Sequence, residues 1–194
     1  MIRPLRPRRR RSGVVVLALL ASVLLASGCL RRAAPSIRYY RLVVDAPAVP
    51  TSSDVRVVGF SAEPPYSSAR MAFRPSPYRL AYHTFHRWAA NPQALVTAAA
   101  RQYFGTDPDD GDATIYLSGR ILRLEAVPQE DPPQASLALA LVARHGGRSI
   151  LKRTYEEAEP LDGDDKEAIA AALSRALTRV FERFQRDLDA VVAP

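Results

Sequence analysis

The segment DDKEAIAAALSRALTRVFERFQRDL, residues 164–188, carries the most regular hydrophobic pattern in the chain and decides the fold. Its apolar residues recur every three or four positions, the spacing of one face of an α-helix. Asp164 followed by Glu167 resembles a capping box and predicts that the helix begins there. The residues on either side of this apolar face are charged, so we expect a long amphipathic helix that covers one face of a sheet. The apolar stripe consists of Ile169, Leu173, Ala176, Val180, Phe184 and Leu188.

A second helix is predicted over residues 91–105. Asn91 suits the N-cap, Pro92 suits the first helical position and Gly105 suits the stop. The segments rich in β-branched and aromatic residues predict strands at 37–44, 54–60, 69–74, 78–83, 113–127, 135–143 and 149–157. Together these elements predict one α+β domain, with a predominantly antiparallel sheet of about six or seven strands and two main helices packed on it.

The connections between the predicted strands differ in kind. Gly146-Gly147 predicts a tight hairpin turn, because glycine adopts the positive φ angles that such turns require. Pro75-Ser76-Pro77 lacks glycine and predicts an irregular connection instead. A change in the phase of alternation near Gly119-Arg120 predicts a β-bulge.

The first 28 residues have the pattern of a secretory signal peptide. Arginines gather between residues 3 and 11, an apolar run follows from Val14 to Ala26, and Ala26-Ser27-Gly28 supplies small residues for cleavage. The uncharged stretch is nearly as long as a membrane span, so an uncleaved anchor is the alternative. Cys29, the only cysteine among 194 residues, follows directly.

The charge of the chain is concentrated in this leader. The chain has 27 basic and 20 acidic residues, a formal net charge of +7. Six of the basic residues precede Cys29, which leaves 21 against 20 and a net charge of +1 for the remainder. The high isoelectric point is therefore no argument for nucleic-acid binding.

Residues that could support chemistry are few. A single cysteine excludes an internal disulfide or a multi-cysteine zinc site. His83 and His86 lack a third nearby ligand, and on a strand they are expected to point to different faces. The acidic stretch from Asp107 to Asp112 lacks the terminal glutamate of a calcium-binding loop. The glutamates at 156, 157 and 159 are interpreted as a charged strand end. We therefore expect no enzyme, no metal site and no cofactor.

Leu25-Ala26-Ser27-Gly28-Cys29 resembles the bacterial lipobox, although Ala26 occupies the position where leucine is commonest. The resemblance implies cleavage before Cys29 and acylation of its thiol and new amine. Residues 29–36 would then form a lipidated tether. Leu30 after the cysteine implies, by the same resemblance, sorting to the outer membrane. An ordinary signal peptide with a chance cysteine is the alternative.

Three stretches of the mature chain resemble a known family. The stretches YYRL at 39–42, FRPSPYRLAYHTFHRWAANPQALV at 73–96 and ATIYLSGRILRLE at 113–125 follow a lipobox in the order found in ABC-type transport auxiliary lipoproteins, including the paraquat-inducible protein C group. The resemblance covers residues 37–192 and is loose from Pro47 to Pro65. It implies a non-enzymatic lipoprotein on the periplasmic face of the outer membrane.

The resemblance also implies partners. Family members accompany MCE-type lipid transporters, so we expect this protein to dock such a transporter at the outer membrane and to support membrane integrity. A homo-oligomer is a further possibility by analogy. The aromatic residues before the second helix, Tyr78, Tyr82, Phe85 and Trp88, are the candidate partner contacts where they are exposed and core residues where they are buried. The alternative is a stand-alone lipoprotein that binds peptidoglycan or assembles a pore; an enzyme such as a lipid hydrolase ranks third.

Overall fold

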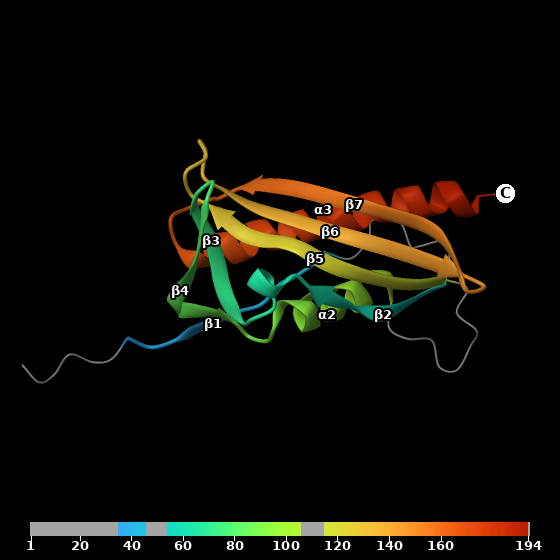
Figure 1. The fold of residues 1–194 in the computed structure, drawn as a ribbon, viewed down its shortest axis with the longest axis horizontal. Coiled ribbons are helices and arrows are strands. Elements are labelled where there is room, and N and C mark those ends of the chain that lie inside the picture. The colour runs from blue at the N-terminus through green and yellow to red at the C-terminus, as the bar shows by residue number, and fades with distance from the viewer. Residues whose placement is uncertain (1–34, 46–53, 106–114, 194) are drawn as a thin grey trace, which may run out of the picture. The chain divides into compact units, whose positions relative to one another are not determined.

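A computed structural model describes residues 35–45, 54–105 and 115–193. Residues 37–194 form one compact unit, and Figure 1 shows how its helices and strands are arranged. Cys29 and the acidic stretch from Asp107 to Asp112 lie outside the described residues. The elements are β1 (Arg38–Tyr40), β2 (Val55–Ala62), the short 3₁₀ helix η1 (Pro64–Tyr66), β3 (Arg70–Ser76), β4 (Arg79–Trp88), α2 (Pro92–Phe104), β5 (Ile115–Val127), β6 (Gln134–His145), β7 (Arg148–Pro160) and α3 (Lys166–Val192).

The predicted fold class is confirmed: the described chain is a single α+β domain with a seven-stranded sheet and two main helices. The strand order is β1-β4-β3-β5-β6-β7, and β2 pairs with β5 beside this path. The long β5–β6 and β6–β7 pairs and the β3–β4 pair are antiparallel. The β1–β4, β2–β5 and β3–β5 pairs are parallel, so the sheet is mixed.

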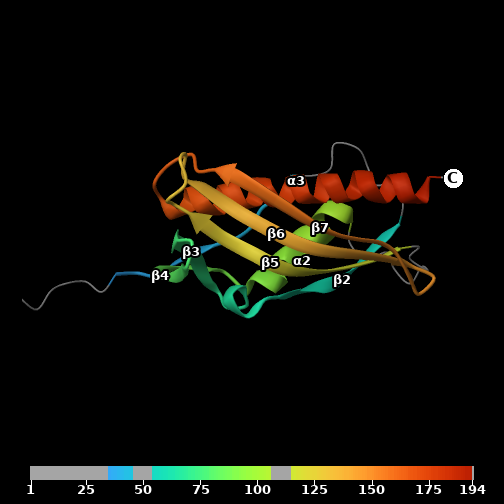
Figure 2. The ribbon, with the colours of Figure 1, turned by 45° about the horizontal axis from the view of Figure 1, so that its top comes forward.

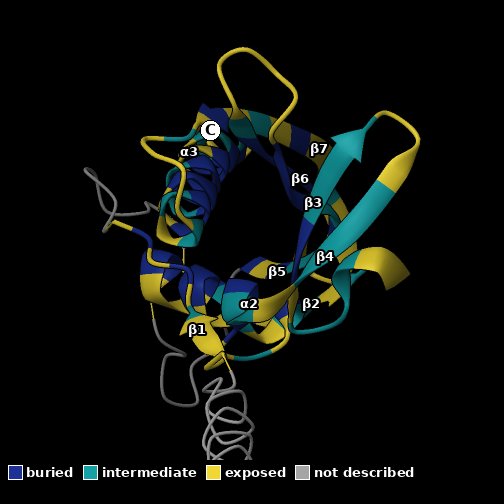
Figure 3. Cartoon of the chain, turned by 90° about the vertical axis from the view of Figure 1, so that its left-hand side faces the viewer, coloured by how far each residue is buried: buried dark blue, intermediate teal, exposed yellow. Residues whose placement is uncertain are grey.

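Both helices pack on one side of this sheet. Helix α3 runs along β6 and β7 while α2 crosses near β2, as Figure 2 shows. Figure 3, viewed along the long axis, shows the sheet curved around one side of the domain and the buried helix faces directed toward it. The whole predicted stripe of α3 is buried, from Ile169 to Leu188. Burial of this apolar stripe provides the main free energy that holds α3 on the sheet.

The ends of the helices follow the predicted capping with one difference. Asn91 caps α2, because its side chain accepts a hydrogen bond from the amide of Ala94 at 3.0 Å. Helix α3 begins one residue later than predicted: Asp165, not Asp164, accepts from the amide of Ala168 at 2.8 Å. With Asp165 as the N-cap, Ala168 and not Glu167 stands three residues later, so the prediction of a capping box from Asp164 and Glu167 is wrong.

The strand boundaries also differ in places. The predicted strand at 37–44 pairs only from Arg38 to Tyr40, and residues 41–45 leave the sheet and lie against α3. There Leu42 and Val44 are buried, and the amide of Val43 donates to Ser174 Oγ at 3.1 Å. The alternating pattern therefore reflects packing against a helix as well as strand pairing.

Of the two predicted connections between strands, the structure confirms one and contradicts the other. Gly146 and Gly147 have φ angles of 53° and 78°, which confirms the hairpin turn between β6 and β7. Strands β3 and β4 are joined by a two-residue turn with Ser76 opposite Arg79, so the prediction of an irregular connection is wrong at the turn itself. The irregularity lies within the strands, where the register shifts between Phe73 and Ser76.

Gly119 marks a close approach, and the change of phase predicted beside it lies further along β5. A β-carbon there would overlap the Phe60 ring and lie 2.9 Å from the Leu141 side chain, so no larger residue fits without movement. The register shift between β5 and β6 occurs slightly later, between Ile121 and Arg123. The predicted bulge is therefore present but displaced along the strand.

Candidate functional site

Strand β4 contains an extended bulge opposite β3. Arg70 pairs with Arg87 and Ala72 pairs with Tyr82, so two steps along β3 correspond to five along β4. Extra residues in a bulge change which face the following side chains occupy. The rings of His83 and His86 consequently lie with centroids 6.0 Å apart. The expectation that these histidines point to different faces is wrong, because it assumed regular alternation.

The two histidines have different surroundings. His83 stacks on Phe73 with centroids 4.5 Å apart, and its Nε2 atom is buried without a hydrogen-bond partner. Burial, followed by the charges of Lys166 and His86, lowers the pKa of His83 from 6.5 to about 4. Tyr40 Oη lies 2.8 Å from His86 Nδ1. In the part of the chain that the structure describes, no group of three or more histidine, cysteine, aspartate or glutamate side chains could hold a metal ion.

The four aromatic residues chosen from the sequence as candidate contacts differ in how far they are exposed. Tyr78 is fully exposed at the β3–β4 turn, and Phe85 is 41% exposed on β4. Tyr82 is half-buried: its hydroxyl donates to the Pro65 carbonyl at 2.8 Å, and the Arg70 guanidinium lies 4.2 Å from its ring centroid. Trp88 is 2% exposed and belongs to the core. Of these four aromatic residues, Tyr78 and Phe85 are the exposed ones.

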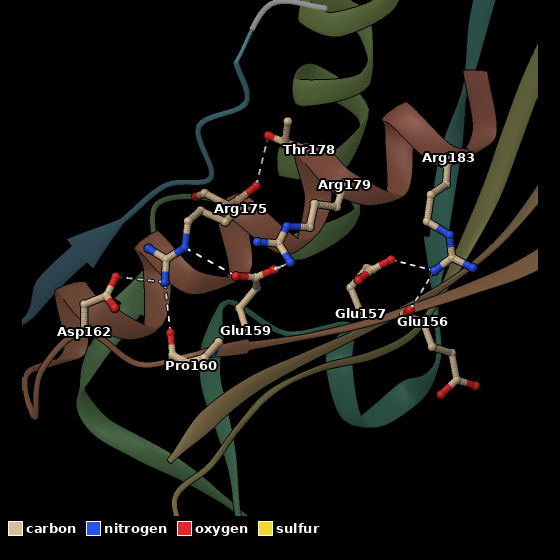
Figure 4. A network of polar contacts seen from close by, with 10 residues as sticks. Glu156, Glu157, Glu159, Pro160, Asp162, Arg175, Thr178, Arg179 and Arg183 are labelled. Atoms are coloured by element: carbon tan, nitrogen blue, oxygen red, sulfur yellow. Dashed lines mark hydrogen bonds and ion pairs between the residues drawn. The ribbon is translucent and has the colours of Figure 1, made fainter. Parts of the chain in front are cut away.

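Glu157 and Glu159 near the end of β7 pair with arginines of α3, as Figure 4 shows, whereas the Glu156 carboxylate pairs with Arg123 of β5. Glu159 is 2% exposed, and its carboxylate lies 2.7 Å from Arg179 Nη1 and 3.5 Å from Arg175 Nε. Arg183 pairs with Glu157 in the same way. The buried Glu159 and the half-buried Glu157 are thus each matched by a cation of the facing helix, which fits the interpretation as a structural strand end and positions α3 along β7.

A second buried carboxylate was not found by reading the sequence. Glu125 on β5 is 2% exposed; it lies 2.8 Å from Arg74 Nε and accepts a hydrogen bond from the Tyr66 hydroxyl at 2.9 Å. Burial and this hydrogen bond raise the pKa of Tyr66 well above its usual value, so the hydroxyl stays protonated. The group ties η1 and β3 to β5. No local pattern indicates this group, because Glu125 is 59 residues from Tyr66 and 51 from Arg74.

These features define the class of the domain: an α+β module whose curved mixed sheet is covered by two helices on one side. The chain belongs to the family of ABC-type transport auxiliary lipoprotein components, whose sequence profile matches residues 45–184. No curated protein matches the sequence closely enough to count as a relative.

Solved structures agree with this fold. A Xanthomonas campestris protein of the DUF330 family is similar with a TM-score of 0.67 at 23% identity, over 79% of this chain and 95% of that one. An uncharacterized protein gives the same TM-score at 10% identity, over 79% of this chain and 99% of the other. At these identities the likeness concerns the fold alone. Within the residues described, no helix is long and apolar enough to cross a membrane.

Proposed function

We propose that this protein is a non-enzymatic, lipid-anchored subunit of an MCE-type intermembrane lipid transport system, which docks the periplasmic transporter component at the outer membrane and supports membrane integrity. Its membership of the auxiliary lipoprotein family carries the proposal. Glu157 and Glu159 near the end of β7 support a non-enzymatic role, since they are paired with arginines of α3 and not left free for acid or base chemistry.

The anchor is proposed at Cys29, after a signal peptide of residues 1–28. Several acyl chains hold a protein on a membrane firmly, whereas one chain gives only marginal binding. We expect Cys29→Ala to abolish lipidation and to remove the protein from the outer-membrane fraction, while Ser36→Ala, outside the lipobox, changes neither. Mass spectrometry of the wild-type N-terminus provides the direct measurement. An N-terminus without acyl mass would refute the anchor.

The docking surface is proposed around the exposed aromatics Tyr78 and Phe85. Exposed aromatic side chains contribute strongly to protein interfaces when a partner covers them. Crosslinking in intact cells followed by identification of the partner tests this. We expect an MCE-domain protein, and we expect Tyr78→Ala to weaken the crosslink while leaving the domain folded. Tyr116→Ala is the control, because Tyr116 is an exposed aromatic at the start of β5, on another part of the sheet.

The outcome separates the proposal from its alternatives. Recovery of only peptidoglycan fragments or a pore protein would overturn transport docking in favour of a stand-alone lipoprotein. Equal crosslinking by wild type, Tyr78→Ala and Tyr116→Ala would refute the assignment of the contact surface alone.

A further inference from the structure

Positive charge is segregated within the folded domain although its total is near zero. No aspartate or glutamate occurs between Glu63 and Asp107. Strands β1, β3 and β4 together carry five arginines and no acidic residue; the arginines are Arg38, Arg70, Arg74, Arg79 and Arg87. Among the residues described, only Arg74 of these five pairs with a carboxylate, that of Glu125. These three strands are therefore basic, and the nearby acids Asp165 and Glu167 at the start of α3 line a pocket with Arg38 alone of the five.

Two of these arginines lie directly opposite each other. Arg70 of β3 is the registered partner of Arg87 of β4, and Arg87 is the registered partner of Tyr39 of β1. Registered neighbours share a face of the sheet, so Tyr39, Arg87 and Arg70 form a row across three strands, called here the arginine row. Like charges in this position are destabilising. An external anion that neutralises the two guanidinium groups would relieve this repulsion.

Apolar side chains flank the arginine row. Tyr39 is 63% exposed, and Phe85, two residues before Arg87 on β4, is 41% exposed. Ile37, at the start of the folded unit, is also exposed. Arginines beside exposed aromatic and aliphatic side chains are typical of surfaces that lie in the headgroup region of an anionic bilayer.

The short segment between Cys29 and β1 limits how far this face can lie from a lipid on Cys29. Seven residues lie between Cys29 and Ile37, and the eight steps from one α-carbon to the other span about 28 Å when fully extended. A lipid on Cys29 would hold β1 within that distance of the bilayer surface. We propose that the arginine row, with Tyr39 and Phe85 beside it, rests on the phosphate-rich surface of an anionic phospholipid membrane. This orientation rests on the lipid anchor proposed above, and it gives Phe85 to lipid and leaves Tyr78 for the protein partner.

The test uses the full lipidated protein reconstituted into vesicles of phosphatidylglycerol and phosphatidylcholine. Lipidation blocks the only native thiol, so Phe85→Cys or Ala171→Cys introduces a single site for a fluorescent label. Ala171 is exposed on α3 and lines a groove with Tyr40, so it lies near the same edge of the sheet but on the helix side. We expect a lipid-borne quencher to quench the label at residue 85 and not the label at residue 171.

Charge variants then test whether the arginines cause the quenching at residue 85. A basic side chain near an anionic surface contributes about a fivefold preference for that surface. The double change Arg70→Gln and Arg87→Gln should therefore lower the preference about 30-fold and reduce quenching at residue 85 to the level at residue 171. The control is Arg144→Gln with Arg148→Gln, which removes the same charge from exposed positions at the β6–β7 turn and should change nothing. Pure phosphatidylcholine vesicles should reproduce the effect of the double change at Arg70 and Arg87.

Equal quenching at the two label positions, or quenching unaffected by Arg70→Gln and Arg87→Gln, would overturn the inference. A photo-crosslinker at residue 39 that captures a protein in intact cells, and no lipid, would also overturn it in favour of a protein partner. Mass spectrometry of the same preparation separates this result from the anchor. Acylated protein with an unquenched label refutes only the orientation, whereas a chain without acyl mass refutes the anchor.

Discussion

Replacing Leu173 with alanine tests the contact between α3 and the sheet most directly. Leu173 is 1% exposed at the centre of the apolar stripe and lies in the main core cluster with residues of the sheet and α2. Truncating a fully buried leucine removes its transfer free energy and leaves a cavity, at a cost of about 2–5 kcal/mol. Each kcal/mol lowers the melting temperature of a domain of this size by about 2–4 °C.

Urea unfolding monitored by circular dichroism measures the effect. We expect the midpoint to fall while the dependence on urea concentration stays unchanged, since the surface exposed on unfolding is nearly the same. Leu173→Met conserves most of the volume and should cost less than about 1.5 kcal/mol. Val191→Ala is the control, because Val191 lies on the same helix but is exposed. A loss below about 0.5 kcal/mol for Leu173→Ala, or a loss equal to that of Val191→Ala, would refute the packing of this stripe.

Three further changes test local features of the structure. Asp165→Ala should cost about 1 kcal/mol because it removes the α3 cap, whereas Asp164→Ala should stay within about 0.5 kcal/mol by the same urea titration; the reverse order would place the helix start one residue earlier. Burial in the folded domain lowers the pKa of His83 from 6.5 to about 4, so the unfolded chain binds the proton more tightly. The stability that the neutral His83 contributes is complete above pH 6.5 and is lost as the pH falls toward 4. Relative to His83→Gln, the wild type should therefore lose free energy of unfolding between pH 7 and pH 5, by no more than about 1.4 kcal/mol per pH unit; parallel pH profiles would contradict this. Glu159→Ala should cost about 1–3 kcal/mol because it leaves two arginines of α3 without their buried acceptor, and thermal unfolding indistinguishable from wild type would show that these ion pairs add nothing.

Much of the secondary structure could be predicted from short stretches of sequence. The α3 stripe, the Asn91 cap with its following proline, and the Gly146-Gly147 turn all act within a few residues of themselves. Such signals depend on helical period, on amide groups that need a local acceptor, and on φ angles that only certain residues adopt. They determine that elements exist and where they begin, to within about one residue here.

The arrangement of these elements was decided by the tertiary structure. No local signal states that β1 and β4 are parallel, or that the bulge in β4 lies opposite Ala72. That bulge brings His83 beside His86 and sets the face on which Phe85 lies.

For the candidate surfaces, the sequence by itself determined the composition: aromatic residues before a helix, and a long interval without acidic residues. The tertiary structure decided which of them are usable, because Trp88 fills the core while Tyr78 faces solvent. It also decided that Arg70 stands opposite Arg87. The physical reason is that strand pairing and burial depend on partners far apart in the chain, and their register is set by the packing of the whole sheet against its two helices.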